Sequence, residues 1–178
     1  CTAAPVVRQT RRMHGMRECL LMFGWLTSWL RAPQPAGPPQ MLRSFDSSDP
    51  TIAGDSIALD GDAWRILGGA EPRTFRLFEV REPGVEHCML TYRAQLRTEG
   101  VARRAYLEMW CRLPGRGEFF SKGFHQAAQG TNAWAEYEIP FYLKQGQKPD
   151  LIKLDLTLEG VGTVWIKDVQ LLQTPLRS

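Results

Sequence analysis

The stretch AYLEMWCRL, residues 105–113, alternates between two kinds of side chain. The odd positions are apolar: Ala105, Leu107, Met109, Cys111 and Leu113. The even positions carry two aromatic rings and two charges: Tyr106, Glu108, Trp110 and Arg112. Successive side chains of a β-strand point to opposite faces of the sheet. The stretch therefore predicts a strand whose odd positions face the core and whose even positions form an outward face.

The same period of two continues through the chain from residue 41 to residue 175. Turn-forming segments rich in Gly, Pro and Asp separate the candidate strands, and many short strands at this spacing are typical of a β-sandwich or barrel. We expect an all-β fold, an antiparallel β-sandwich of jelly-roll type, with one helical turn in 124–134. The expected strands are SIALD (56–60), AWRIL (63–67), TFRLFEV (74–80), HCMLTYRAQLRT (87–98), ARRAYLEMWCRL (102–113), GEFFS (117–121), AEYEIPFYL (135–143), LIKLDLTLE (151–159) and TVWIKDVQLL (163–172).

Residues 1–40 have a different composition and predict a disordered or signal-like leader. Several arginines precede an apolar run within 17–31, the layout of a secretory signal, and the run is shorter than the ~20 residues that span a bilayer. Segment 31–40, RAPQPAGPPQ, reads as a Pro-rich linker because proline breaks helices and interior strands. We expect 17–31 to be a signal or membrane anchor and 41–175 to be an extracytoplasmic domain. A gene-call artefact and a packed helix are the alternatives for the leader.

Composition argues against several function classes. The net charge of +3 is small, and no basic stripe interleaved with aromatics appears, so nucleic-acid binding is not expected. The three histidines are scattered, and no transition-metal spacing or nucleophile elbow occurs. Glycoside hydrolysis needs two acids at a defined separation, and the spacing of the available acids predicts no such pair: Glu108, Glu118, Glu136, Glu138 and Asp155. We therefore expect no catalytic residues, and we do not expect the protein to be an enzyme.

Segments 87–98 and 102–113 could form a hairpin with Glu99 and Gly100 as its loop. That register sets apolar residues opposite apolar residues, and it places Cys88 opposite Cys111. Opposed residues in an antiparallel pair have Cα atoms ~4.5–5.5 Å apart, which is within disulfide range. One hypothesis is therefore a cross-strand disulfide in an exported chain, and the other is two buried free thiols. In a jelly roll the two strands could instead lie in opposite sheets, with both cysteines still pointing inward.

The outward residues of these segments form a candidate ligand face. Tyr106 and Trp110 would stack on a flat ligand such as a sugar ring, and four polar side chains would bond its hydroxyl groups: Glu108, Arg112, Arg93 and Gln95. In 151–159 the leucines are expected inside and Asp155 outside. The alternative is an ordinary solvent-facing side of a sheet with an occasional ring.

Three segments resemble the galactose-binding-like jelly rolls. GTNAWAEYEIPFYL (130–143) resembles their t-x-x-W-x-x-y-x-i-x-F pattern, LIKLDLTLEGVGTVWIKDVQLL (151–172) resembles their last two strands, and TYRAQLRTEG (91–100) resembles an earlier strand. The chain is thereby similar to non-catalytic carbohydrate-binding modules, which are usually extracytoplasmic. The resemblance implies carbohydrate recognition, and a protein–protein or sensory accessory domain on the same fold is the alternative.

The resemblance also implies a structural calcium ion, and no other cofactor is expected. Asp168 matches the final-strand acid that holds calcium in some such modules, and Asp46 and Asp49 lie near the start of the domain. Calcium takes six to eight oxygen ligands, of which these three side chains are only a part. The alternative is a capped turn in which Asp168 bonds backbone amides.

Overall fold

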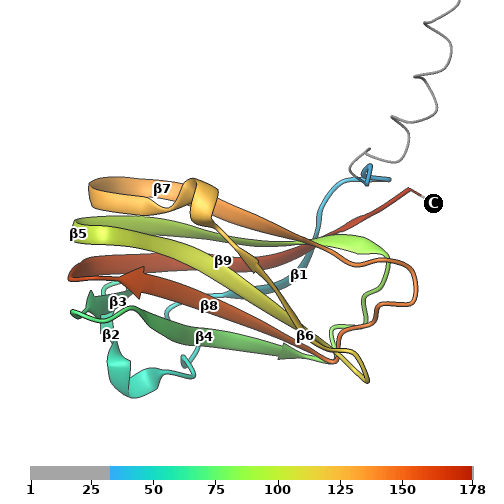
Figure 1. Cartoon of the computed structure of the whole chain (residues 1–178), viewed down its shortest axis with the longest axis horizontal. Coiled ribbons are helices and arrows are strands. Elements are labelled where there is room, and N and C mark those ends of the chain that lie inside the picture. Colours follow the sequence, from blue (N-terminus) through green and yellow to red (C-terminus); the bar gives the residue numbers. More distant parts are fainter. Residues whose placement is uncertain (1–32, 178) are drawn as a thin grey trace, which may run out of the picture. The chain divides into compact units, whose positions relative to one another are not determined.

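The computed structural model describes residues 33–177. Within them nine strands form a single antiparallel sheet, in the order β2-β3-β9-β5-β8-β4, with β1 paired to β9 and with β6 and β7 paired to β5 (Figure 1). The fold is an all-β antiparallel sandwich, as the alternation predicts. The strands are β1 Gln40–Phe45, β2 Ile57–Asp60, β3 Ala63–Gly68, β4 Arg73–Arg81, β5 Cys88–Leu113, β6 Gly117–Lys122, β7 Ala128–Tyr142, β8 Leu151–Glu159 and β9 Gly162–Pro175.

The long strand β5 connects the two layers of the sandwich. It runs for 26 residues. Its first half pairs with β9 and β7, and its second half pairs with β8 and β6. Gly100, with φ of 60°, lies where the strand leaves one layer for the other. The sheet therefore curls back on itself, and a single strand contributes to both layers.

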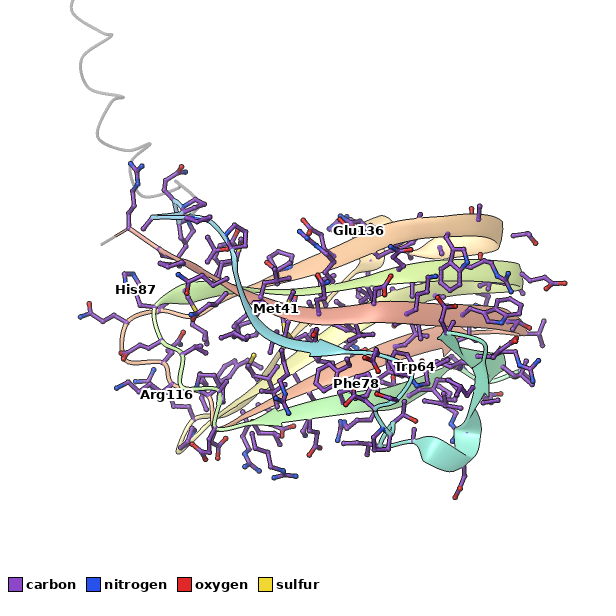
Figure 2. All side chains as sticks on the ribbon, turned by 180° about the vertical axis from the view of Figure 1, so that it is seen from behind. Met41, Trp64, Phe78, His87, Arg116 and Glu136 are labelled. Atoms are coloured by element: carbon purple, nitrogen blue, oxygen red, sulfur yellow. The ribbon has the colours of Figure 1, made fainter. Side chains whose placement is uncertain are left out.

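The core lies between the two layers. Every odd position of 105–113 is buried, and Leu154, Leu156 and Leu158 of β8 are fully buried. Trp64 and Phe78 meet in the interior with ring centroids 5.1 Å apart (Figure 2). The inward residues predicted from the period of two are confirmed, because alternation along a strand fixes which side chains face the core.

The predicted hairpin between 87–98 and 102–113 is wrong. Met89 pairs with Thr174 of β9 and Tyr142 of β7, whereas Trp110 pairs with Lys153 of β8 and with β6. Glu99 and Gly100 form no two-residue loop, since the strand continues through them. The alternation fits either arrangement, because any antiparallel partner with an apolar inner face satisfies it. The two segments lie in opposite layers.

Cys88 and Cys111 are buried free thiols in this structure. Burial raises the pKa of Cys88 to about 11 and that of Cys111 to about 12, and the nearby Cys88 thiol adds to the rise at Cys111. They are not the directly opposed residues of a hairpin. A disulfide between them stays a hypothesis.

We expect both thiols to resist alkylation in the native protein at pH 8, because the thiolate is the reactive form and burial makes it scarce. Iodoacetamide labelling followed by peptide mass mapping measures the modification at each position. Urea-unfolded protein should take one adduct at Cys88 and one at Cys111. A disulfide-linked peptide pair in the unreduced digest would contradict this result and establish the bond.

Sequence reasoning missed one strand and the start of another, whereas the helical turn expected within 124–134 is present. Strand β1 was not expected, yet it pairs with β9. Strand β7 begins at Ala128, so most of the segment expected to hold a helical turn is strand, and the turn is a short 3-10 helix, Phe124–Gln126. Pro35 forms an isolated bridge with Leu176.

The signal or anchor predicted at 17–31 lies outside the described residues, and the domain boundary at residue 41 stays a prediction. Within 33–177 no helix has the length and apolar character needed to cross a bilayer.

Candidate functional site

Four predicted site residues share one outward surface, which we call the β8 face. It is the outer side of the layer formed by β4, β8, the second half of β5, and β6. The predicted residues Tyr106, Glu108, Trp110 and Arg112 all lie on it, since they alternate with core residues of β5. The face also includes Arg76, Glu118, Phe120, Lys122, Lys153, Asp155, Thr157 and Glu159, with Phe124 and Arg104 beside it.

Glu108 is a buried acid in this face. Its side chain accepts hydrogen bonds from Trp110 Nε1 at 2.6 Å and from Thr157 Oγ1 at 2.9 Å. Lys122 Nζ lies 3.2 Å from its carboxylate. The residue is only 2% exposed. A buried carboxylate must be paired and hydrogen-bonded, and Glu108 meets both conditions, so it holds the Trp110 ring in place.

Asp155 lies directly opposite Glu108 on β8. It is equally buried and accepts a hydrogen bond from Arg76 Nε at 3.1 Å. Burial raises the pKa of Asp155, and the Glu108 charge adds to the rise, whereas Arg76 lowers it. Asp155 points outward as predicted, but it is buried rather than solvent-facing.

Two aromatic pairs mark this face. Phe120 lies 4.9 Å from Trp110, and Phe124 lies 4.7 Å from Tyr106, measured between ring centroids. Phe120 is 56% exposed and Phe124 is 45% exposed, whereas Tyr106 is buried and donates its hydroxyl hydrogen to Glu159. Tyr106 and Trp110 are four residues apart on one strand, about 14 Å at ~3.4 Å per residue. The exposed rings therefore belong to Phe120 and Phe124, which sequence reasoning did not place in the site. Phe120 belongs to the FF of the GRGEFFSKG segment, and Phe124 directly follows that segment.

The charges of the β8 face are paired with one another. Besides the contacts of Glu108 and Asp155, further ion pairs on the face include Arg112–Asp150 at 2.8 Å, Lys153–Glu118 at 2.6 Å and Arg104–Glu159 at 2.8 Å. A ligand on this face would therefore meet hydrogen-bonding groups rather than an uncompensated charge.

Arg93 and Gln95 do not join the other four predicted residues. They lie on the first half of β5, in the opposite layer, where Arg93 pairs with Glu138 at 2.9 Å. Their grouping with Tyr106 and Trp110 depended on the hairpin register and is wrong for the same reason. They belong to a second surface, the β9 face, defined by Trp165 and Lys167 of β9, Arg93, Gln95 and Arg97 of β5, and Trp134 of β7.

The residues predicted to hold calcium lie close in register, since Phe45 pairs with Val169 and Asp46 and Asp168 come next on their chains. Asp46 Oδ1 accepts a hydrogen bond from the Ser48 amide, and Asp49 Oδ2 accepts one from the Asp46 amide, each at 2.9 Å. No group of three or more His, Cys, Asp or Glu in 33–177 is arranged to hold a metal ion. These bonds close a turn at Asp46 and Asp49, and both calcium binding and a turn capped by Asp168 stay predictions.

We expect Glu108→Ala to destabilise the fold by about 3 kcal/mol, because it leaves Lys122, Trp110 and Thr157 without their shared acceptor. Urea unfolding measures the change in the free energy of unfolding. Glu118→Ala is the matched control, since Glu118 forms one ion pair at a more exposed position and its loss should cost below about 1 kcal/mol. Equal losses of unfolding free energy in the two variants would show that the hydrogen bonds of Glu108 stabilise the fold no more than the exposed ion pair of Glu118 does.

The sequence matches no protein-family model and no curated protein. Comparison of structures finds carbohydrate-binding modules with β-sandwich folds. The CBM22-1 xylan-binding domain of Xyn10C from Paenibacillus barcinonensis aligns with a TM-score of 0.50 and 11% identity, over 82% of this chain and 99% of that domain. A CBM4 structure aligns with a TM-score of 0.47 and 10% identity, over 73% of this chain and 77% of that one. TmCBM61 in complex with β-1,4-galactotriose aligns with a TM-score of 0.38 and 17% identity, over 76% of this chain and 88% of that one.

The alignment with the TM-score of 0.50 shows a shared fold. The chain has the β-sandwich architecture of carbohydrate-binding modules, which the sequence resemblance predicted. A fold of this kind supports many unrelated functions, so function has to be argued from the faces themselves.

Proposed function

We propose that this domain is a non-catalytic recognition module that binds a glycan along the β8 face. One observation carries the proposal: the exposed rings of Phe120 and Phe124 lie against Trp110 and Tyr106, on either side of a hydrogen-bonded polar centre. Sugar rings pack on aromatic faces while their hydroxyl groups bond to nearby polar side chains. The two aromatic pairs are farther apart than one sugar ring, which favours an oligosaccharide.

The ligand we propose is a neutral glycan. Each charged group of the β8 face that the structure describes has an opposite charge beside it, as in Lys122–Glu108 and Arg76–Asp155. Bringing an acidic sugar onto such a face would place an unpaired charge there, which is costly where water is excluded. Xylan is the first probe, because the domain with the TM-score of 0.50 is named as xylan-binding.

Two acids do lie side by side on this face, and their surroundings support binding rather than catalysis. A glycosidase needs two carboxyl groups that reach a sugar bond from opposite sides. Glu108 and Asp155 are neighbours in one sheet, both are buried, and both are engaged by Trp110, Thr157 and Arg76. Neither carboxylate is presented to a ligand. An exported location would suit a module with a glycan ligand.

A glycan array followed by titration calorimetry tests the proposal. The wild type should bind a neutral polysaccharide such as xylan, and Phe120→Ala and Phe124→Ala should each weaken binding about tenfold, equivalent to ~1.4 kcal/mol. The control is Tyr142→Ala, which removes an exposed ring (42%) on the opposite layer and should leave affinity unchanged. Equal losses in all three variants would contradict the site. Absence of glycan binding by the folded wild type would overturn the proposal in favour of a protein ligand.

A further inference from the structure

The β9 face carries a row of alternating cations and aromatic rings across four strands. Strand pairing sets Arg65 of β3 opposite Trp165 of β9, and Trp165 opposite Arg97 of β5. The Arg97 guanidinium lies 4.0 Å from the Trp165 ring centroid and 5.7 Å from that of Trp134 on β7. Lys167 Nζ approaches Trp134 to 4.8 Å. Two tryptophans and a stacked arginine are thus gathered on a surface outside the β8 face.

Four acids of this face lie beside cations other than Arg97. Asp60 accepts the indole hydrogen of Trp165 at 2.9 Å and lies 3.8 Å from Arg65. Asp62 accepts a hydrogen bond from Lys167 at 2.8 Å. Two further acids, Glu136 and Glu138, both lie beside Arg93, and the exposed Glu99, two residues along β5 from Arg97, forms no ion pair with it. Figure 2 labels Glu136, which lies on β7 at the outer side of this layer.

Arg97 differs from the other cations of the face. Among residues 33–177 none forms a hydrogen bond or ion pair with its guanidinium, and its contacts are the two rings. Arg97 is half-buried, as is Trp134, whereas Trp165 beneath it is buried. The guanidinium has five N–H donors, which need acceptors from water or from a ligand.

A stacked arginine with free donors has a definite ligand chemistry. Stacking orients the guanidinium plane and leaves its edge to bond a carboxylate or sulfate through two parallel hydrogen bonds. Trp134 lies on β7, which pairs with β5 only, so an apolar ring stands at the edge of the layer beside the cation. The combination suits a ligand that joins an oxyanion to a ring with apolar faces.

We propose that the β9 face is a second binding site, which takes an acidic saccharide by a bidentate bond from Arg97 to its carboxylate or sulfate group beside Trp134. The site is independent of the β8 face. It has the opposite charge preference, because its central cation lacks the acid partner that each β8-face cation has.

Affinity gel electrophoresis of the full chain tests this proposal. Polygalacturonate and dextran sulfate are the anionic probes, and methyl-esterified pectin and uncharged dextran are their neutral counterparts. The wild type should be retarded more strongly by at least one anionic polymer than by its neutral counterpart, and the polymer that acts identifies the bound group. Arg97→Gln should weaken retardation about tenfold, the usual scale for a charge-assisted bidentate bond. Arg97→Lys keeps the positive charge but lacks the two parallel N–H donors of the guanidinium, so this variant should bind more weakly than wild type.

Arg65→Gln is the matched control, since it removes the same charge from the same row but from an arginine that has Asp60 beside it. It should keep wild-type retardation, and thermal unfolding of each variant verifies that it is folded. Equal loss in Arg65→Gln and Arg97→Gln would overturn the proposal, as would equal retardation by charged and neutral polymers or by neither anionic polymer. Retardation only by a single-stranded oligonucleotide would also overturn it. A parallel gel that contains xylan measures binding at the β8 face separately. Absence of binding at one face is therefore distinguishable from absence of binding at the other.

Discussion

Trp110→Ala is expected to reduce affinity for a neutral glycan by about tenfold to a hundredfold, equivalent to ~1.4–2.8 kcal/mol. The Trp110 ring supports the exposed Phe120 ring and fixes the geometry of Glu108 through its indole hydrogen bond. Its loss therefore removes a stacking surface and loosens the polar centre together. Titration calorimetry with the glycan found on the array measures the change.

Trp110→Phe separates the two contributions of the indole. It keeps an aromatic ring beside Phe120 and removes only the donor to Glu108. If stacking carries the affinity, Trp110→Phe should retain most of the binding that Trp110→Ala loses. If Trp110→Ala binds as wild type does while remaining folded, the β8 face is not the glycan site.

Gly162→Ala is expected to have the largest effect on stability, a loss of about 3 kcal/mol or more. Gly162 has φ of 136°, and a Cβ atom there would lie 2.6 Å from the Cα atom of Val101 and 2.9 Å from the carbonyl oxygen of Gly100. These atoms belong to the backbone where β5 passes between layers, so no side-chain rotation relieves the contact. The EGVG turn needs glycine because two backbones meet at that point.

Differential scanning calorimetry should record a lower melting temperature for Gly162→Ala, by about 10 °C for a domain of this size. Gly69→Ala is the matched control. No atom lies within 4 Å of a Cβ at Gly69, whose φ is outside the left-handed region, so its melting temperature should change little. A melting temperature of Gly162→Ala equal to that of the control would contradict the close backbone approach.

The fold could be predicted from the sequence because alternation reports which side of each strand is buried. The odd positions of 105–113 and the leucines of β8 were placed correctly on that ground. Strand partners could not be predicted, since the apolar side of β5 matches β8 and β9 as well as it would match its own other half. A fold resemblance constrains topology in general terms, but it does not set register.

The candidate site was predicted only in part, for two physical reasons. Arg93 and Gln95 face outward, as Tyr106 does, but the pattern along the strand does not reveal that β5 changes layers between them. Glu108 and Asp155 were expected to face outward, and they do, yet neighbouring side chains cover them. Burial of an outward residue depends on long side chains from adjacent strands, which the pattern along one strand does not contain.

The bridge between Pro35 and Leu176 determines how this domain can be joined to other protein segments. The amide of Ala36 donates to the carbonyl of Pro175 at 2.7 Å, so the first and last described strands leave the sandwich at one corner (Figure 1). Neighbouring termini tolerate circular permutation and insertion of a domain into a host loop. Other protein segments can therefore be attached to the domain at that one corner.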